Sequence, residues 1–193
     1  MPERPPCYVL FYIDASLEAE ALDVSMKEEE KAFVLEVSES LYSHPQFSLQ
    51  VALAAYGDDN YGTPDLNTTY DRRTQLSSAL DAWSLLDPNS EDIKNATTGL
   101  KVIGTWEHYF YVVLMSASPE SVIKTADNSA YYPWTIGVAL AEQNMGWVAF
   151  YRANLTMKAT TEYILREMCL AGPDHTGPVT QNFEVADAAA NNQ

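Results

Sequence analysis

The stretch that most restricts the fold is the apolar run Tyr8–Ile13 (YVLFYI), which ends directly in Asp14, Ala15 and Ser16. The run has no alternation of apolar and polar residues, and this pattern is typical of a strand buried on both faces. Such strands belong to parallel sheets covered by helices on both sides. A carboxylate and a hydroxyl then follow at the carboxyl end of the strand, where several α/β folds hold a metal ion.

Further segments predict the rest of a sheet. The run FSLQVALAAYG predicts a second strand, and a short β-prone segment after it, LNTTYD, predicts an antiparallel partner. The runs YFYVVLMS and WVAFYRA predict two later strands. The predicted ranges are 8–13, 47–57, 66–71, 109–116 and 147–153.

Helical patterns separate these runs. Ser25 and Glu28 form a predicted capping box for a helix over residues 25–44, and its apolar residues recur at helical spacing. Phe33, Val37, Leu41, Val113 and Leu114 are expected to form the core between this helix and the sheet. Other helices are predicted over 73–83, from 87–88, from 118–120, over 133–144 and over 160–170.

The order of elements predicts an α/β domain of the three-layer Rossmann type. Its central sheet is mostly parallel with one antiparallel edge strand, and helices cover both faces. Residues 1–172 are expected to form this domain, and residues 173–193 a polar tail or linker.

The composition limits the classes of partner that the chain is expected to bind. The 193 residues contain 27 Asp and Glu against 11 Lys and Arg, for a net charge of −16. Such a surface repels phosphate backbones and anionic lipids, so nucleic-acid and membrane-surface binding are not expected. No run approaches the roughly 18–20 apolar residues that span a bilayer. The remaining expectation is a protein partner.

The strand ending in Asp-x-Ser, together with the order of elements and an antiparallel hairpin second, resembles the von Willebrand factor A domain. The resemblance implies a rim site for Mg²⁺ or Mn²⁺, where a partner's carboxylate completes the metal shell. Asp14 and Ser16 match the first two ligand positions. Glu18 replaces the second serine, Thr98 (or Thr97) lacks the usual preceding glycines, and Ala117 stands where the family has aspartate. We therefore expect that the frame is kept, the ion is lost and no cofactor binds.

Enzyme signatures are weak, and we expect no catalysis. The three histidines are scattered, and no G-x-S-x-G elbow or glycine-rich phosphate loop is present. No small-molecule substrate is expected. Five residues are candidates for binding a partner: Asp58, Asp59, Tyr131, Tyr132 and Trp134. For the two aspartates, a solvated turn is preferred to a Ca²⁺ site. For the three aromatics, packing over the edge of the sheet is the equal alternative to an exposed interface.

Two functional classes remain open. Segments such as LMSASPESV resemble members of the family with a broken metal site that dock a subunit into the Mediator, a multi-subunit transcription co-activator, which implies an intracellular, nuclear protein. The alternative is an extracellular adhesion-type domain with glycans on the sequons at Asn67, Asn95 and Asn154.

The cysteines bear on this choice. Extracellular relatives often join their termini by a disulfide, and the positions of Cys7 and Cys169 permit one. Because the N-terminus shows no signal-peptide pattern and leads straight into the first strand, reduced thiols and an intracellular protein are the preferred expectation.

Overall fold

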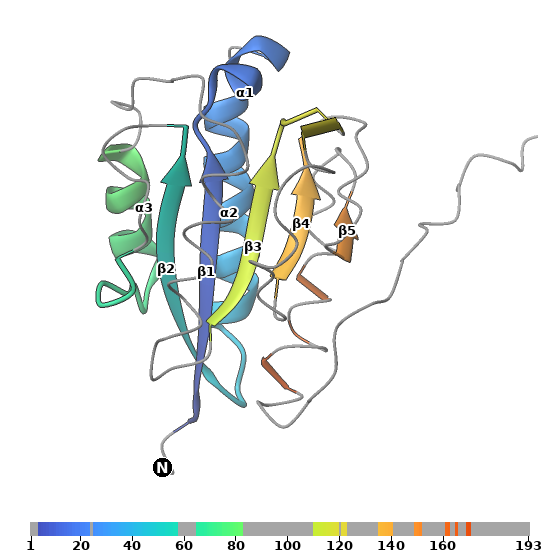
Figure 1. Ribbon diagram of the computed structural model, residues 1–193. Coiled ribbons are helices and arrows are strands. Elements are labelled where there is room, and N and C mark those ends of the chain that lie inside the picture. The colour runs from blue at the N-terminus through green and yellow to red at the C-terminus, as the bar shows by residue number, and fades with distance from the viewer. Residues whose placement is uncertain are drawn as a thin grey trace, which may run out of the picture.

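A computed structural model describes residues 4–23, 25–57, 65–82, 110–119, 121–122, 135–140, 149–151, 161–162, 165 and 169–170. Its centre is a five-stranded sheet in the order β2-β1-β3-β4-β5, with every neighbouring pair parallel (Figure 1). The strands are β1 (Pro6–Asp14), β2 (Ser48–Tyr56), β3 (Phe110–Ser116), β4 (Thr135–Ala139) and β5 (Ala149–Tyr151). The predicted α/β fold class is confirmed.

The antiparallel element is a single bridge at the outer edge of β2. Val51 and Tyr70 exchange two backbone hydrogen bonds, at 3.0 and 2.8 Å. The predicted strand over 66–71 is shorter than expected because its first half forms a turn. There the Asp65 carboxylate accepts from the Asn67 N–H (3.0 Å) and from the Thr68 hydroxyl (2.7 Å).

Three described helices accompany the sheet: α1 (Leu17–Leu22), α2 (Met26–Tyr42) and α3 (Arg73–Ala82). In Figure 1, α2 runs behind the sheet, α3 lies beside β2, and α1 sits above the carboxyl ends of the strands. The burial expected for five core residues is confirmed, since each is at most 1% exposed: Phe33, Val37, Leu41, Val113 and Leu114. Val113 and Leu114 are consecutive in β3 and point to opposite faces of the sheet, so only one of them can lie between α2 and the sheet. The helical spacing of the apolar residues in α2 and the apolar run in β3 therefore identify residues that are buried.

The predicted capping box does not form. The Ser25 hydroxyl donates to Asp23 Oδ1 at 2.7 Å, and it makes no hydrogen bond to a backbone N–H of α2. Glu28 instead accepts from Lys31 Nζ at 3.0 Å, one turn further along α2. The box is absent because Glu28 N–H donates to Ser25 O at 2.9 Å and Ser25 N–H donates to Asp23 Oδ1 at 2.8 Å, so both N–H groups of the box have other acceptors.

The prediction of a helix over 133–144 is wrong, since residues 135–139 form β4. This strand lies between β3 and β5, and Gly137 pairs with Leu114 of β3. Ile136 and Val138 are β-branched and buried, and Gly137 would weaken a helix interior. Pairing with β3 and β5 therefore decides the conformation of residues 135–139, although the spacing of the apolar residues also fits a helix.

The remaining helix predictions are only partly covered. Val122 N–H donates to Pro119 O at 2.9 Å, so a turn does begin near the predicted start at 118–120. Residues 161–162 are helical, and Leu170 N–H donates to Leu165 O at 3.1 Å, a wider turn than an α-helix makes. The helix predicted from 87–88 and the boundary at 172–173 lie outside the described residues. Within the described residues, no helix has the length and apolar character needed to cross a membrane.

Candidate functional site

Asp14 is the centre of the candidate site, at the carboxyl end of β1 between β2 and β3. Its side chain is fully buried. Oδ1 accepts from Ser16 N–H at 3.0 Å, while Oδ2 accepts from the Tyr56 hydroxyl and from Ala117 N–H, both at 2.6 Å. Both carboxylate oxygens thus already accept hydrogen bonds from groups of this chain. We call this edge of the sheet, at the carboxyl ends of the strands, the rim.

Tyr56 is a site residue that the sequence reasoning missed. It ends β2 directly opposite Asp14, and its hydroxyl also lies 3.0 Å from the carbonyl oxygen of Met115. Burial, followed by the charge of Asp14, raises the pKa of Tyr56 well above its ordinary value, so the hydroxyl stays protonated and donates. It therefore occupies one acceptor site of Oδ2, and Ala117 N–H occupies another. Only the parallel register of β1 with β2 brings these two residues together.

Glu30 was also missed. It is a fully buried residue of α2, and its Oε1 accepts from Asp14 N–H at 3.1 Å, while Oε2 has no hydrogen-bond partner in the described part of the chain. Helical spacing places Glu30 three and four residues before the core residues Phe33 and Val34. That spacing was the signal that could have identified it as a buried acid.

The two buried carboxyl groups disfavour each other's charge. Burial, followed by the charge of Asp14, raises the pKa of Glu30 well above its ordinary value of 4.5. Burial also raises the pKa of Asp14, against the opposing effect of its hydrogen bonds from Ala117, Ser16 and Tyr56. Asp14 has the donors that an anion needs, whereas Glu30 has one donor and an oxygen without a partner. Of the two carboxyl groups, Glu30 is therefore the one that stays protonated to higher pH.

A pH dependence of stability follows, and its sign can be stated. A buried acid with a raised folded pKa stabilises the fold fully below its unfolded pKa, and this contribution is lost as pH rises through the folded value. We expect that the free energy of unfolding falls from about pH 4.5 upward and that Glu30→Gln makes the fall shallower. Urea unfolding at a series of pH values checks this. Glu36→Gln, at an exposed position of the same helix, should follow the wild type. Parallel curves for wild type and Glu30→Gln would contradict the expectation.

Ser16 and Gly57 fix the backbone beside Asp14. Ser16 is the N-cap of α1, and its Oγ accepts from Ala19 N–H at 3.4 Å. Gly57 has a φ of +81°, and a Cβ at this position would lie 2.4 Å from Ser16 N and 2.5 Å from Ser16 Cα. A side chain at residue 57 would therefore displace the loop that carries Ser16.

The structure brings three of the five predicted ligand positions together. Asp14, Ser16 and Ala117 meet at the rim, but Ala117 contributes only its backbone N–H. Glu18 lies in the first turn of α1, where its Oε2 is buried without a hydrogen-bond partner among the described residues. Thr98 lies outside the described residues. Among those described, no group of three or more His, Cys, Asp or Glu could hold a metal ion. The residues placed here do not supply the oxygen shell that Mg²⁺ requires.

Other predicted site residues are mostly not covered. Asp58, Asp59, Tyr131, Tyr132 and Trp134 lie outside the described residues, as do Asn95 and Asn154. Asn67 is exposed, and it follows Asp65 in the turn described above. An exposed turn is the setting in which a sequon can be glycosylated.

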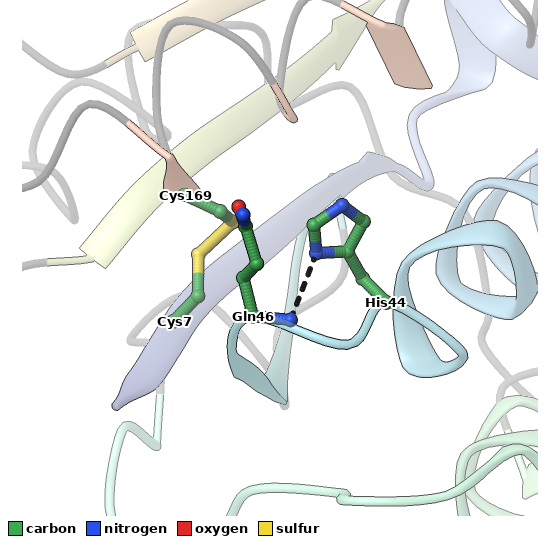
Figure 2. Close-up of a disulfide and its surroundings, with 4 residues drawn as sticks. All are labelled: Cys7, His44, Gln46 and Cys169. Atoms are coloured by element: carbon green, nitrogen blue, oxygen red, sulfur yellow. Dashed lines mark hydrogen bonds between the residues drawn. A yellow bond between two sulfur atoms is a disulfide. The ribbon is translucent and has the colours of Figure 1, made fainter. Parts of the chain in front are cut away.

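Cys7 and Cys169 form a disulfide, with their Cα atoms 5.4 Å apart (Figure 2). The expectation of reduced thiols is therefore wrong for this structure. Cys7 is in the first residues of β1, at the end opposite Asp14, and the segment around Cys169 lies within bridging distance of it. Figure 2 also shows the turn at His44 and Gln46, where Gln46 N–H donates to His44 Nδ1 at 3.4 Å. The disulfide ties the two ends of the described chain together away from the rim.

Comparison with solved structures finds similar folds. Proximal thread matrix protein 1 from the mussel byssus has a TM-score of 0.54 at 13% identity, over 86% of this chain and 47% of that one. BatB from Bacteroides thetaiotaomicron scores 0.43 at 12% identity, over 70% of this chain and 65% of that one. The vWF domain of the pili tip protein Mfa5 from Porphyromonas gingivalis scores 0.41 at 19% identity, over 69% of this chain and 48% of that one.

The likeness to the mussel protein supports a von Willebrand A-like fold. No protein-family model matches the sequence, and no curated protein matches it. The chain spans about half the length of the mussel protein, at 47%. At such low identity the likeness concerns the fold alone.

Proposed function

We propose that this chain is a non-enzymatic, protein-binding domain of the von Willebrand A type that works outside the cell without a rim metal. The observation that carries the proposal is the environment of Asp14. Both of its carboxylate oxygens already accept hydrogen bonds from Ser16, Tyr56 and Ala117. A domain with this rim would bind its partner through side chains of its own surface rather than through a shared cation.

The loss of metal binding can be tested directly. We expect no saturable Mg²⁺ or Mn²⁺ binding, because Tyr56 lies against Oδ2 and Ala117 supplies no ligand atom. Titration calorimetry on the chelated protein measures it, with Asp14→Ala as the matched variant. A micromolar Mn²⁺ isotherm that disappears in Asp14→Ala would refute the proposal. Tyr56→Phe asks whether removing the hydroxyl restores any affinity.

The extracellular location is favoured by the disulfide. Bonds of this kind persist in oxidising compartments and are rare in the cytosol and nucleus. The mussel protein belongs to a byssus by its name, and this setting agrees with the adhesion alternative. Docking into a transcription co-activator has no comparable support. An extracellular domain whose partner is another protein is therefore our proposal.

Intact mass of protein from its native source tests the location. We expect a mass two daltons below that of the fully reduced chain, no alkylated cysteine, and glycan mass on the exposed Asn67. Digestion with an N-glycosidase before peptide mapping assigns the glycan. Two alkylated cysteines and an unmodified Asn67 would contradict the extracellular location and support the intracellular docking module.

Binding itself is tested by co-purification of the tagged chain from the same source. The partner should remain bound in excess EDTA, because no cation is part of the proposed interface. Loss of the partner in EDTA, with recovery on adding Mn²⁺, would overturn the metal-free mode of binding.

A further inference from the structure

The sequon at Asn67 is held by its neighbours on the N-terminal side. Asn67 is its acceptor residue, and Thr69 supplies the hydroxyl that the N-x-[ST] pattern requires. The Asp65 carboxylate accepts from Asn67 N–H at 3.0 Å and from the Thr68 hydroxyl at 2.7 Å. Leu66 is buried and anchors this turn in the core. The first half of the sequon therefore has a fixed conformation.

The second half of the sequon is fastened to the outer edge of β2, which ends the described sheet on this side (Figure 1). The Thr69 hydroxyl donates to Gln50 Oε1 at 3.0 Å, and both residues are half-buried. Tyr70 exchanges two backbone hydrogen bonds with Val51, and its carbonyl oxygen also accepts from the Tyr42 hydroxyl at 3.0 Å. The hydroxyl that the sequon requires is therefore already used by the folded chain.

N-linked glycosylation needs access to both ends of the sequon. The amide nitrogen of Asn67 forms a bond to the anomeric carbon of a lipid-linked oligosaccharide, the bond from that carbon to the lipid pyrophosphate breaks, and a base of the transferase takes one amide proton. Because only Ser or Thr serves as the third residue, the transferase must also contact its hydroxyl, here Thr69 Oγ1. In the folded chain that hydroxyl is hydrogen-bonded to Gln50. The transferase can therefore bind the sequon only when residues 67–70 are detached from β2.

We propose that Asn67 accepts an N-linked oligosaccharide only before Tyr70 pairs with Val51, so that closure of the sequon onto β2 ends the period in which the chain can be modified. The inference rests on the proposed function, because a chain that leaves the cell passes through the compartment that contains the transferase. It adds which state of the chain is the substrate. Asn67 and Thr68 are exposed in the folded domain, so a glycan attached earlier is accommodated there.

A comparison of a folded and an unfolded acceptor tests the proposal. The full chain, made without glycans and oxidised, and a peptide of residues 64–72 are each incubated with a purified transferase and a lipid-linked oligosaccharide. Peptide mapping by mass spectrometry measures the occupancy of Asn67, and an unrelated sequon peptide verifies that the enzyme is active. We expect that the peptide is modified and that the full chain reacts at Asn67 at least about tenfold more slowly, because only the locally opened chain is a substrate. Equal rates would overturn the proposal, and so would a peptide of residues 64–72 that is not modified.

Two variants release the sequon without changing it. Gln50→Ala removes the acceptor of the Thr69 hydroxyl, and Tyr42→Phe removes one hydrogen bond to Tyr70 O. At a temperature at which circular dichroism shows every variant folded, each should be modified about fivefold faster than the wild type, as expected for the loss of one hydrogen bond of ordinary net strength. Ser40→Ala removes an exposed hydroxyl that bonds within α2, and it should react as wild type. Wild-type rates in both release variants would overturn the proposal.

The failure of this inference is distinguishable from the failure of the proposed function. Native protein with the Cys7–Cys169 disulfide but without a glycan on Asn67 would overturn the inference and leave the extracellular location intact. Two alkylated cysteines in native protein would instead contradict the proposed function. The rates measured with the purified chain do not depend on where the native protein is located.

Discussion

Removing the Cys7–Cys169 disulfide should lower the free energy of unfolding by about 5 kcal/mol in the chain-entropy model, because the bridge joins residues 162 positions apart. Measured losses for natural disulfides are about 2–5 kcal/mol. The test variant is Cys7→Ala/Cys169→Ala. Alanine is preferred to serine because residue 7 is almost inaccessible to solvent, and serine would bury a hydroxyl there. Urea unfolding of the oxidised wild type and the variant measures the difference.

A matched control separates the cross-link from side-chain packing. Wild type kept reduced by a phosphine retains both sulfur atoms and should lose nearly as much stability as the double variant. Equal unfolding midpoints for oxidised and reduced wild type would show that the bridge does not form or does not constrain the unfolded chain.

Truncation of Leu114 should have the next largest effect. Leu114 is a fully buried residue of β3, between β1 and β4 in the sheet. Leu114→Ala removes apolar surface and leaves a cavity, so we expect a loss of about 2–5 kcal/mol. Thermal and urea unfolding check the value.

Val37 of α2 is also fully buried, and Val37→Ala should cost somewhat less because it removes a smaller side chain. Leu22→Ala provides the contrast, because this leucine is 45% exposed and its truncation should cost much less stability. If Leu114→Ala melted like the wild type, the placement of Leu114 in the core would be wrong.

Much of the fold was predictable because burial leaves a regular pattern in the sequence. The runs in β1, β2 and β3 are apolar and bounded by turn residues, and Phe33, Val37 and Leu41 recur at helical spacing in α2. β4 was mistaken for a helix because its five residues, TIGVA, are too few to distinguish the two periods. Only its neighbours in the sheet decide between them.

The candidate site was predictable only where it follows the strand ends. Asp14 and Ala117 could be placed together because parallel strands end at one edge. Tyr56 and Glu30 could not be assigned to Asp14, since their contacts depend on the register of β2 and on the face that α2 turns inward. The prediction of reduced thiols was wrong because the positions of two cysteines permit a bridge without requiring it, and only the folded chain shows that Cys7 and Cys169 meet.

The inner position of β1 has a consequence for how the sheet forms. β1 precedes the other described strands in the chain, and its Tyr8 pairs with Phe110 on the β3 side. Until β3 leaves the ribosome, one apolar edge of β1 has no native neighbour, and such edges pair readily with other chains. Contacts between distant segments also make folding slow. We therefore expect that nascent chains need a chaperone until residue 116 has emerged, and that closure by Cys169 comes last.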